Sequence, residues 1–346
     1  MRRRRVKEAG GGTQLGKVAR SLVRILRYVA RRVPQAIPVL IGVAIVSFLI
    51  LKLAPGDIAD ILAGEAGTTT PEYAAELRTR FGLDQPVWLQ LWNYLAKAAT
   101  LDLGYSQRHG MPVIELISGR IPATLIVMAA STVLAVVVGT LLGVVAARFV
   151  NRPIDTVISV VALLCYATPL FWIGLMMIVL FSVQLGWLPS GGFETLGVAK
   201  SGLARTLDIA RHAAMPSVTL ALFYLAVYAR LTRASMLETL SQDYVKLARA
   251  KGISETRVAL RHALPNAILP TVTMTGVQIN TLLGGAVLVE TVFAWPGIGR
   301  LAYEAVFTRD HNLLIGILLI SSVLVISINL IVDLLYAWLD PRIEVG

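Results

Sequence analysis

The sequence predicts an all-α, polytopic membrane protein with six transmembrane helices. Of its 346 residues, 56% are hydrophobic and only 15% are charged, and the mean hydropathy is +0.70. A soluble domain would carry roughly a quarter charged residues. The apolar residues gather in uncharged runs near or above the roughly 20 residues with which a helix spans a bilayer. These runs are Val33–Leu51, Ala123–Ala147, Thr156–Leu185, Ala213–Ala229, Ala267–Val289 and Asn312–Val332.

Residues 1–32 form a basic arm that holds eleven Lys and Arg and one Glu. Its second half predicts an amphipathic helix, because apolar side chains alternate with basic ones at Val18, Leu22, Ile25, Leu26 and Val29. This pattern favours a helix on an anionic membrane surface over a targeting segment or a partner contact. The next apolar run is longer than the core of a signal peptide, and no A-x-A site follows it. Residues 33–53 are therefore predicted to remain as the first transmembrane helix.

The distribution of Lys and Arg sets the predicted orientation. In membrane proteins, the loops that carry more Lys and Arg lie in the cytoplasm. This rule places the arm, the 148–154 loop, the 230–266 loop and both termini on the cytoplasmic side. The arm alone contributes +10 of the net charge of +11, so the rest of the chain is nearly neutral. The excess of basic residues in the arm therefore indicates the lipid bilayer as a partner, and it does not indicate a nucleic acid.

An extracytoplasmic region, residues 54–122, separates the first two spans. It begins with a turn signal at Pro55-Gly56, and two short helices are predicted at Glu72–Phe81 and Val87–Thr100. The second helix carries Trp88, Trp92 and Tyr94. Such aromatic residues more often anchor a helix at the membrane interface than form a recognition surface, so anchoring is favoured.

Residues 123–346 hold the other five spans. The run Thr156–Leu185 would be about 45 Å long as one straight helix, which predicts a tilt or a bend near Pro169. Ala213–Ala229 is the shortest run, and the orientation of the C-terminal half depends on its crossing the membrane. Small residues recur at spacings that allow two helix backbones to approach closely, as at Gly139-x-x-x-Gly143 and Gly284-Gly285.

No catalytic constellation is visible in the sequence. It contains neither H-E-x-x-H nor G-x-S-x-G, its four histidines are isolated, and Cys165 is the single cysteine. The segment Gly11–Val18 satisfies G-x-x-x-x-G-K, but it ends in Val, which lacks the hydroxyl that holds magnesium. We therefore expect no catalytic residue, cofactor or metal site in this chain.

Few polar side chains lie within the predicted spans. Glu290 and Asp333 are close to span ends, where interfacial hydration stabilises charge, and structural roles are predicted for both. An ion-coupled carrier would be expected to bury more acidic groups near the midplane of the membrane. The chain thus contains no evident source of energy for transport, which indicates an energy-supplying partner.

The cytoplasmic segment 237–265, called the docking loop below, has the pattern of a helix pair. Leu237, Leu240, Tyr244 and Leu247 follow helical spacing and predict one apolar helix face. Gly252 is predicted to end this helix, because glycine readily adopts the left-handed conformation found after a last turn. Ser254 is predicted to cap a second helix that carries Val258, Leu260 and Arg261. Such a projection suits a soluble partner in the cytosol.

The docking loop resembles the E-A-A-x3-G-x9-I-x-L-P motif of the permeases of ATP-binding-cassette importers. Aligned on Gly252, the chain has Lys246-Leu247-Ala248 before it and His262-Ala263-Leu264-Pro265 after it. Ala248, Gly252, Leu264 and Pro265 match the motif at the required spacing. Lys246 replaces Glu and His262 replaces Ile, so the resemblance does not carry over an acidic contact to the ATPase at position 246.

Further blocks resemble the dipeptide/oligopeptide/nickel branch of the same family. They cover nearly the whole chain from about residue 28, and the basic arm is not among them. The blocks are LAPGD at 53–57, FGLDQP at 81–86, LDLGYS at 101–106, RIPATL at 120–125, ARLTRASMLETLSQDYVKLARAKG at 229–252, VETVFAWPGIGR at 289–300 and DLLYAWLDPRI at 333–343.

The resemblance implies the type I importer permease fold and a set of partners. A second homologous permease completes the pathway, usually as a different chain. Two ATPase subunits bind the cytoplasmic loops and use ATP and magnesium, and an extracytoplasmic binding protein delivers the substrate. ATP-driven closure of the ATPases moves the loop helices and switches access from outside to inside. The docking residues that it indicates here are Tyr244, Lys246, Leu247, Ala248, Gly252, Ser254, Leu264 and Pro265.

The expected function is that of a permease subunit for peptides or related small solutes in the bacterial cytoplasmic membrane. A secondary, ion-coupled carrier is the first alternative, and the scarcity of acidic residues in the spans disfavours it. An intramembrane enzyme is the second alternative, and the missing catalytic motifs disfavour it.

Overall fold

The computed structural model describes residues 14–53, 71–80, 82–106 and 108–339. Four features that the sequence predicts lie outside the described residues or side chains. They are the apolar stripe of the arm, the first three residues and the side chains of the Gly11–Val18 segment, the Pro55-Gly56 turn and the side chain of Asp333. The described part is almost entirely helical, with one two-stranded hairpin in which β1 (Tyr105–Ser106) pairs antiparallel with β2 (Met111–Pro112).

Every predicted span falls on a helix. Within the described residues, four helices are long and apolar enough to cross a membrane, and a bent pair can supply a fifth crossing. These four are α5 (Val113–Arg148), α8 (Gly202–Leu240), α12 (Leu269–Val292) and α14 (His311–Leu339). The first helix, α1 (Gln14–Leu53), is also long, but its apolar part, Pro34–Ile50, is shorter than the other spans. The run Ala213–Ala229, the shortest prediction, lies in the middle of the 39-residue α8.

The third span bends where the sequence predicts it. Helix α6 (Pro153–Ala167) and the continuous pair α7 (Leu170–Met177) and η1 (Ile178–Gln184) meet at an angle of 103°. Pro169 precedes the first residue of α7 and has an extended backbone, with ψ at 132°. Proline restricts the preceding residue to extended conformations and has no N–H to continue a helix. The predicted bend is therefore confirmed.

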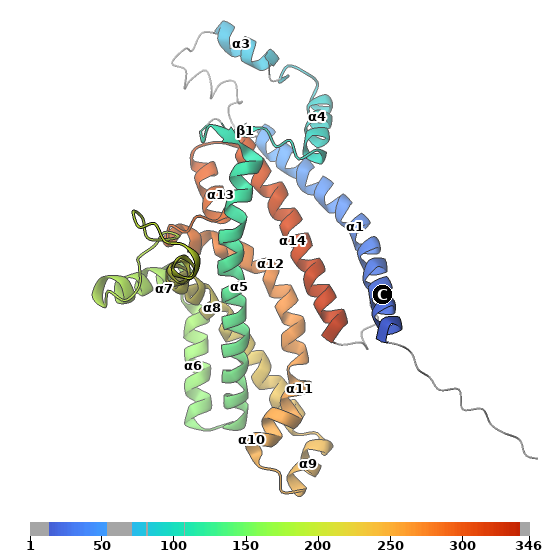
Figure 1. Cartoon of the computed structure of the whole chain (residues 1–346), viewed down its shortest axis with the longest axis vertical. Helices are drawn as coiled ribbons and strands as arrows, with labels where there is room; N and C mark the ends of the chain where they lie inside the picture. The colour runs from blue at the N-terminus through green and yellow to red at the C-terminus, as the bar shows by residue number, and fades with distance from the viewer. Residues whose placement is uncertain (1–13, 54–70, 81, 107, 340–346) are drawn as a thin grey trace, which may run out of the picture.

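Helices α5 and α8 form the central packed pair of the molecule (Figure 1). A Cβ atom on Gly139 would lie 2.7 Å from Tyr228 Cβ, and one on Gly143 would lie 2.6 Å from Thr232 Cβ and 2.7 Å from the Ala229 carbonyl oxygen. The predicted close approach at this glycine pair is confirmed. Gly285 packs against Leu220 of α8, whereas nothing lies near Gly284.

We expect Gly143→Ala to destabilise the protein, because the new methyl group would force the backbones of α5 and α8 apart. Overpacking of this kind costs about 1–3 kcal/mol, and it should lower the unfolding temperature of the purified protein. Gly119→Ala is the matched control, since Gly119 lies on the same helix with open space around it. That variant should be neutral or slightly stabilising, because alanine favours helices. Equal effects of the two variants would contradict the packing argument.

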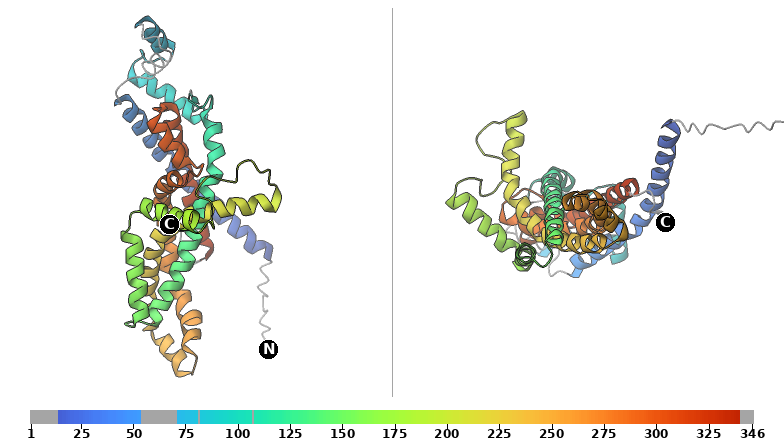
Figure 2. Two further views of the ribbon diagram at one scale, coloured as in Figure 1. Left: turned by 90° about the vertical axis from the view of Figure 1, so that its left-hand side faces the viewer. Right: turned by 90° about the horizontal axis from the view of Figure 1, so that it is seen from below.

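The two ends of the molecule differ. At one end lie the hairpin, α3 (Pro71–Arg80), α4 (Val87–Ala99) and α13 (Ile298–Phe307), and at the other lie α9 (Asp243–Ala250) and α10 (Glu255–Arg257) (Figures 1 and 2). Helix α1 runs along α14. Tyr94 of α4 stacks on Phe48 of α1 with ring centroids 5.9 Å apart, while Trp88 and Trp92 are 70% and 67% exposed. This exposure suits membrane anchoring, which stays the favoured interpretation.

Candidate functional site

The docking loop connects α8 to α12 and forms the cytoplasmic tip of the molecule (Figure 1). One prediction about it is wrong: the apolar face from Leu237 to Leu247 does not lie on a single helix. Helix α8 ends at Leu240 and α9 begins at Asp243, with a turn between them. As a result Leu240 packs inward, whereas Tyr244 and Leu247 are 42% and 57% exposed. Of these four apolar residues, the two exposed ones therefore belong to α9.

Gly252 ends α9 as predicted, in a left-handed conformation with φ of 74°. Its N–H donates to the Arg249 carbonyl at 2.9 Å, and the Ile253 N–H donates to the Ala248 carbonyl at 3.4 Å. This pair of bonds is the Schellman arrangement, in which an apolar contact usually joins the residue after the glycine to the last turn. Ile253 makes that contact with the buried Val245 and Ala248.

Two interactions hold the helices of the docking loop together. The first is a small core of Val245, Ala248 and Val258, all at most 6% exposed. The second is Arg249, whose Nε lies 2.9 Å from Glu255 Oε1 and whose Nη1 donates to the Leu240 carbonyl at 3.3 Å. Because Arg249 contacts α8 and α10 from α9, the loop is a compact unit and not a set of independent turns.

The second helix of the loop differs from a regular α-helix. Ser254 takes the capping position before α10, but within the described residues its side chain makes no capping hydrogen bond. The chain continues as a π-helix, η2 (Val258–Ala263), and then as α11 (Leu264–Ala267). Val258 is buried as an interior residue, whereas Leu260 is 48% exposed and Arg261 is also exposed.

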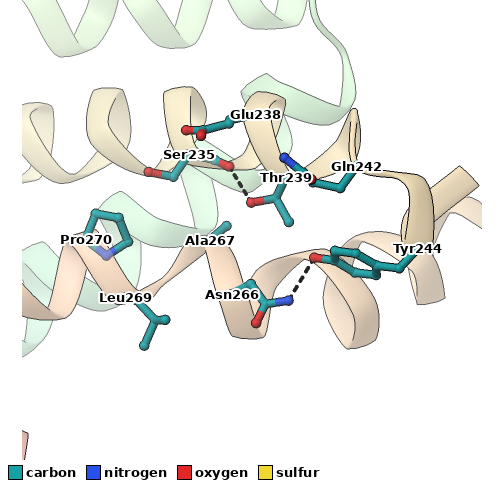
Figure 3. A pocket seen from close by; sticks show the side chains of 9 residues that line it. All are labelled: Ser235, Glu238, Thr239, Gln242, Tyr244, Asn266, Ala267, Leu269 and Pro270. Atoms are coloured by element: carbon teal, nitrogen blue, oxygen red, sulfur yellow. Dashed lines mark hydrogen bonds between the residues drawn. The ribbon is translucent and has the colours of Figure 1, made fainter. Parts of the chain in front are cut away.

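A hydrogen bond also joins α9 of the docking loop to α11, the short helix that leads into α12. Asn266 Nδ2 donates to Tyr244 Oη at 2.8 Å, which joins α9 to α11 beside an open hollow of about 390 Å³ (Figure 3). The hollow lies between the end of α8 and the α11–α12 junction, and its wall includes Glu238, Gln242 and Leu269.

The predicted docking residues therefore divide into two groups. Ala248 and Leu264 pack inside, the latter against the cluster around Met236. The exposed residues are Tyr244, Lys246, Leu247, Gly252, Ser254 and Pro265. Lys246 lies 2.9 Å from Asp243 in a solvent-exposed ion pair. The outer surface of the loop thus combines exposed apolar side chains with an ion pair, and Ala248 and Leu264 pack beneath it.

A second buried arrangement lies at the opposite end, around Glu290, and here a prediction is wrong. Hydration was expected to stabilise this carboxylate, yet Glu290 is 0% exposed. Its Oε1 accepts from Thr124 Oγ1 at 2.6 Å, and its carboxylate accepts the first-turn N–H groups of Gly299 and Arg300 in α13. A helix N-terminus stabilises negative charge. The Glu290 carboxylate is therefore stabilised by hydrogen bonds from α5 and α13 and not by water, and these bonds join the two helices to α12, which is a structural role.

Two family models match this chain. The model described as the binding-protein-dependent transport system inner membrane component matches residues 139–345, and its N-terminal companion matches residues 25–128. The chain belongs to this permease family. It is thus a multi-pass permease of the bacterial inner membrane, and its family name indicates that it works with a substrate-binding protein.

Individual relatives agree with this assignment. The permease is 40% identical over 318 residues to the oligopeptide transport system permease AppB of Bacillus subtilis, covering 92% of this chain and 99% of AppB. It is 41% identical over 324 residues to the glutathione transport system permease GsiC of Escherichia coli, covering 92% and 99%. It is 38% identical to the dipeptide permease DppB of Alkalihalophilus pseudofirmus, covering 92% and 100%.

The fold of the permease also matches a solved importer. A chain of the MetNI methionine ABC transporter in an inward-facing conformation superimposes with a TM-score of 0.52 at 20% identity. The match covers 66% of the permease and 97% of that chain. The predicted type I importer permease fold is confirmed.

Proposed function

We propose that this permease carries peptides or related small solutes inward, driven by ATPase subunits that bind its docking loop. The relatives at 38–41% identity are named for oligopeptide, dipeptide and glutathione transport, which supports a peptide-like substrate. A second homologous permease, most simply a different chain, completes the pathway. A binding protein delivers the substrate at the outer end.

The observation that carries the proposal is the construction of the docking loop. Leu247, Leu260 and Tyr244 present exposed apolar groups on the docking loop, which also carries exposed charged residues, five basic and three acidic. Exposed apolar side chains among charged ones are typical of a surface that binds another protein. This surface rests on the core around Val245, and Arg249 and Tyr244 link it to α8 and α11. A displacement of α9 is therefore passed to the helices on both sides of the loop.

ATP hydrolysis takes place in the partner subunits. ATP and magnesium bind the two ATPase subunits, and this chain needs no cofactor of its own. Differential contact of the ATPases with the docking loop in their open and closed states shifts the permease between outward and inward access, because a partner shifts an equilibrium only by binding the two states unequally.

Transport by the reconstituted complex tests the energy source. We expect uptake to stop when the partner ATPases bind ATP but cannot hydrolyse it, and to continue with a protonophore present while ATP is maintained. Uptake that survives the inactive ATPases, or that collapses with the protonophore, would establish an ion-coupled carrier instead. The substrate is identified from the ligand that co-purifies with the binding protein, and a ligand without a peptide bond would contradict the peptide assignment.

A further inference from the structure

One face of α12 is exposed along most of its length and carries polar side chains. Beyond the first two residues of the helix, the exposed residues are Thr273, Val277, Asn280, Thr281, Gly284 and Leu288. Steps of three and four residues separate them, so they form one stripe along the helix, called the α12 stripe below. From Thr273 to Leu288 the stripe is about 22 Å long, which is most of the hydrocarbon thickness of a bilayer.

The opposite face of α12 is packed inside the protein. Leu282, Ala286 and Val289 are at most 2% exposed and belong to the core cluster that α12 shares with α5 and α8. Helix α12 runs from α11, next to the docking loop, to the end of the molecule where α13 lies (Figure 1). The α12 stripe therefore extends from the cytoplasmic side toward the outer side.

Polar groups distinguish the α12 stripe from the exposed face of α5. Every exposed residue of α5 from Leu125 to Val145 is apolar, which suits lipid or a packed neighbouring chain. The α12 stripe instead holds one amide, two hydroxyl groups and Gly284, where a Cβ atom would meet nothing within 4 Å. Exposed polar side chains within a span face the interior of a bundle or a water-filled cavity.

Asn280 lies at the middle of α12, as the twelfth of its 24 residues. Its polar neighbours are already paired, because Tyr224 Oη donates to Thr281 Oγ1 at 3.2 Å and Thr281 Oγ1 lies 3.0 Å from Gln278 Oε1. Within the described part of the chain, the side chain of Asn280 makes no hydrogen bond. Asn280 therefore presents an amide with its donors and acceptor available at the level of the membrane midplane.

We propose that the α12 stripe lines the translocation pathway and that Asn280 contacts the main-chain amide groups of a passing peptide. The asparagine side chain has N–H donors and a carbonyl acceptor, the same groups that a peptide bond presents, so the two can pair reciprocally. The inference rests on the proposed import of peptides. Transporter substrate sites commonly lie near the midplane, and Gly284, one turn farther out, leaves room there for peptide side chains.

The stripe contains no Asp, Glu, Lys or Arg. Contacts to the main chain would therefore admit peptides whose side chains carry either sign of charge. The permease would select its substrate by the amide groups that all peptides share, and the binding protein would select among the side chains.

Cysteine labelling of the assembled transporter in liposomes tests whether water reaches the α12 stripe. Cys165, the single cysteine of the chain, is first replaced by alanine, and Asn280→Cys, Gly284→Cys or Val133→Cys is then added. Val133 is the matched control, because it is 61% exposed near the middle of α5 on an apolar face. The probe is sulfonatoethyl methanethiosulfonate, which is charged and attacks the thiolate, and the mass of this chain reports the reaction.

We expect both stripe variants to be labelled at least about tenfold faster than Val133→Cys, because an apolar environment suppresses the thiolate and each unit of pKa is a factor of ten. Labelling of neither stripe variant faster than the control would overturn the proposal. That result would mean that lipid or a partner chain covers the stripe.

Asn280→Asp tests the contact with the substrate, because it keeps the size of the side chain and adds a negative charge. Maximal uptake rates of Ala-Lys-Ala and Ala-Glu-Ala are compared. We expect their ratio to shift about tenfold toward the lysine peptide, since the new charge attracts one peptide and repels the other. A purely structural role of Asn280 would change both rates alike, so an unchanged ratio would overturn the contact. Failure of the wild-type transporter to take up either tripeptide would instead contradict the proposed peptide import, whatever the labelling rates.

Discussion

Gly252→Pro should abolish both transport and substrate-stimulated ATP hydrolysis, while the protein still inserts in the membrane. Proline fixes φ near −65°, whereas Gly252 has φ of 74° and donates its N–H to the Arg249 carbonyl. The change therefore destroys the turn between α9 and α10 and the contact of Ile253 with the core of the docking loop. Uptake and ATPase assays of the reconstituted complex measure the outcome.

Asparagine at position 252 is the matched control for this prediction. Asparagine adopts the left-handed conformation more readily than other non-glycine residues and keeps the N–H group. A Cβ atom at position 252 would meet nothing within 4 Å, so the new side chain has room. We expect Gly252→Asn to retain most of the activity. Full activity of the proline variant would falsify the docking role of this loop.

Glu290→Ala should destabilise the protein more than Gly143→Ala does. It leaves the Thr124 hydroxyl and the N–H groups of Gly299 and Arg300 buried without an acceptor. Each unsatisfied group costs about 1–3 kcal/mol, so the total is on the order of 3 kcal/mol or more. The unfolding temperature of the purified complex should fall sharply, and transport should fall with it as α13 separates from α5 and α12.

Glu304→Ala provides the comparison for this loss. Glu304 lies on α13, is 36% exposed and pairs with Arg300 at 2.8 Å. An exposed ion pair contributes about 1 kcal/mol or less, so this variant should unfold close to the wild-type temperature. Similar unfolding temperatures for the two variants would show that the buried carboxylate does not hold the outer end together.

The sequence pattern correctly predicted those features of the fold that depend on residues close together in the chain. The apolar runs located the spans, Pro169 located the bend, and Gly252 located the end of α9, because each effect acts within a few residues. The turn at Ser241–Gln242 was not predicted, since neither residue disrupts a helix by itself and the apolar spacing continues across it. The break accompanies the packing of Leu240 against the clusters around Met236 and Val245, which are contacts made by the folded chain.

Long-range contacts explain what the sequence did not reveal. Glu290 and its partner Thr124 are 166 residues apart, so nothing near Glu290 in the sequence indicates that its carboxylate is buried and satisfied. Sequence patterns also left the individual docking contacts open, because they depend on the surface of another protein.

The glycine contacts between α5 and α8 have a mechanical consequence. At Gly139 and Gly143 the two backbones leave no room for a methyl group, so we expect α5 and α8 to move together as one rigid pair. The 36 residues of α5 give this helix pair a length of about 54 Å. Helix α8 joins the docking loop at one end, and Thr124 of α5 contacts Glu290 near the other. By this geometry, a tilt of only about 5° at the cytoplasmic end displaces the outer end by about 5 Å.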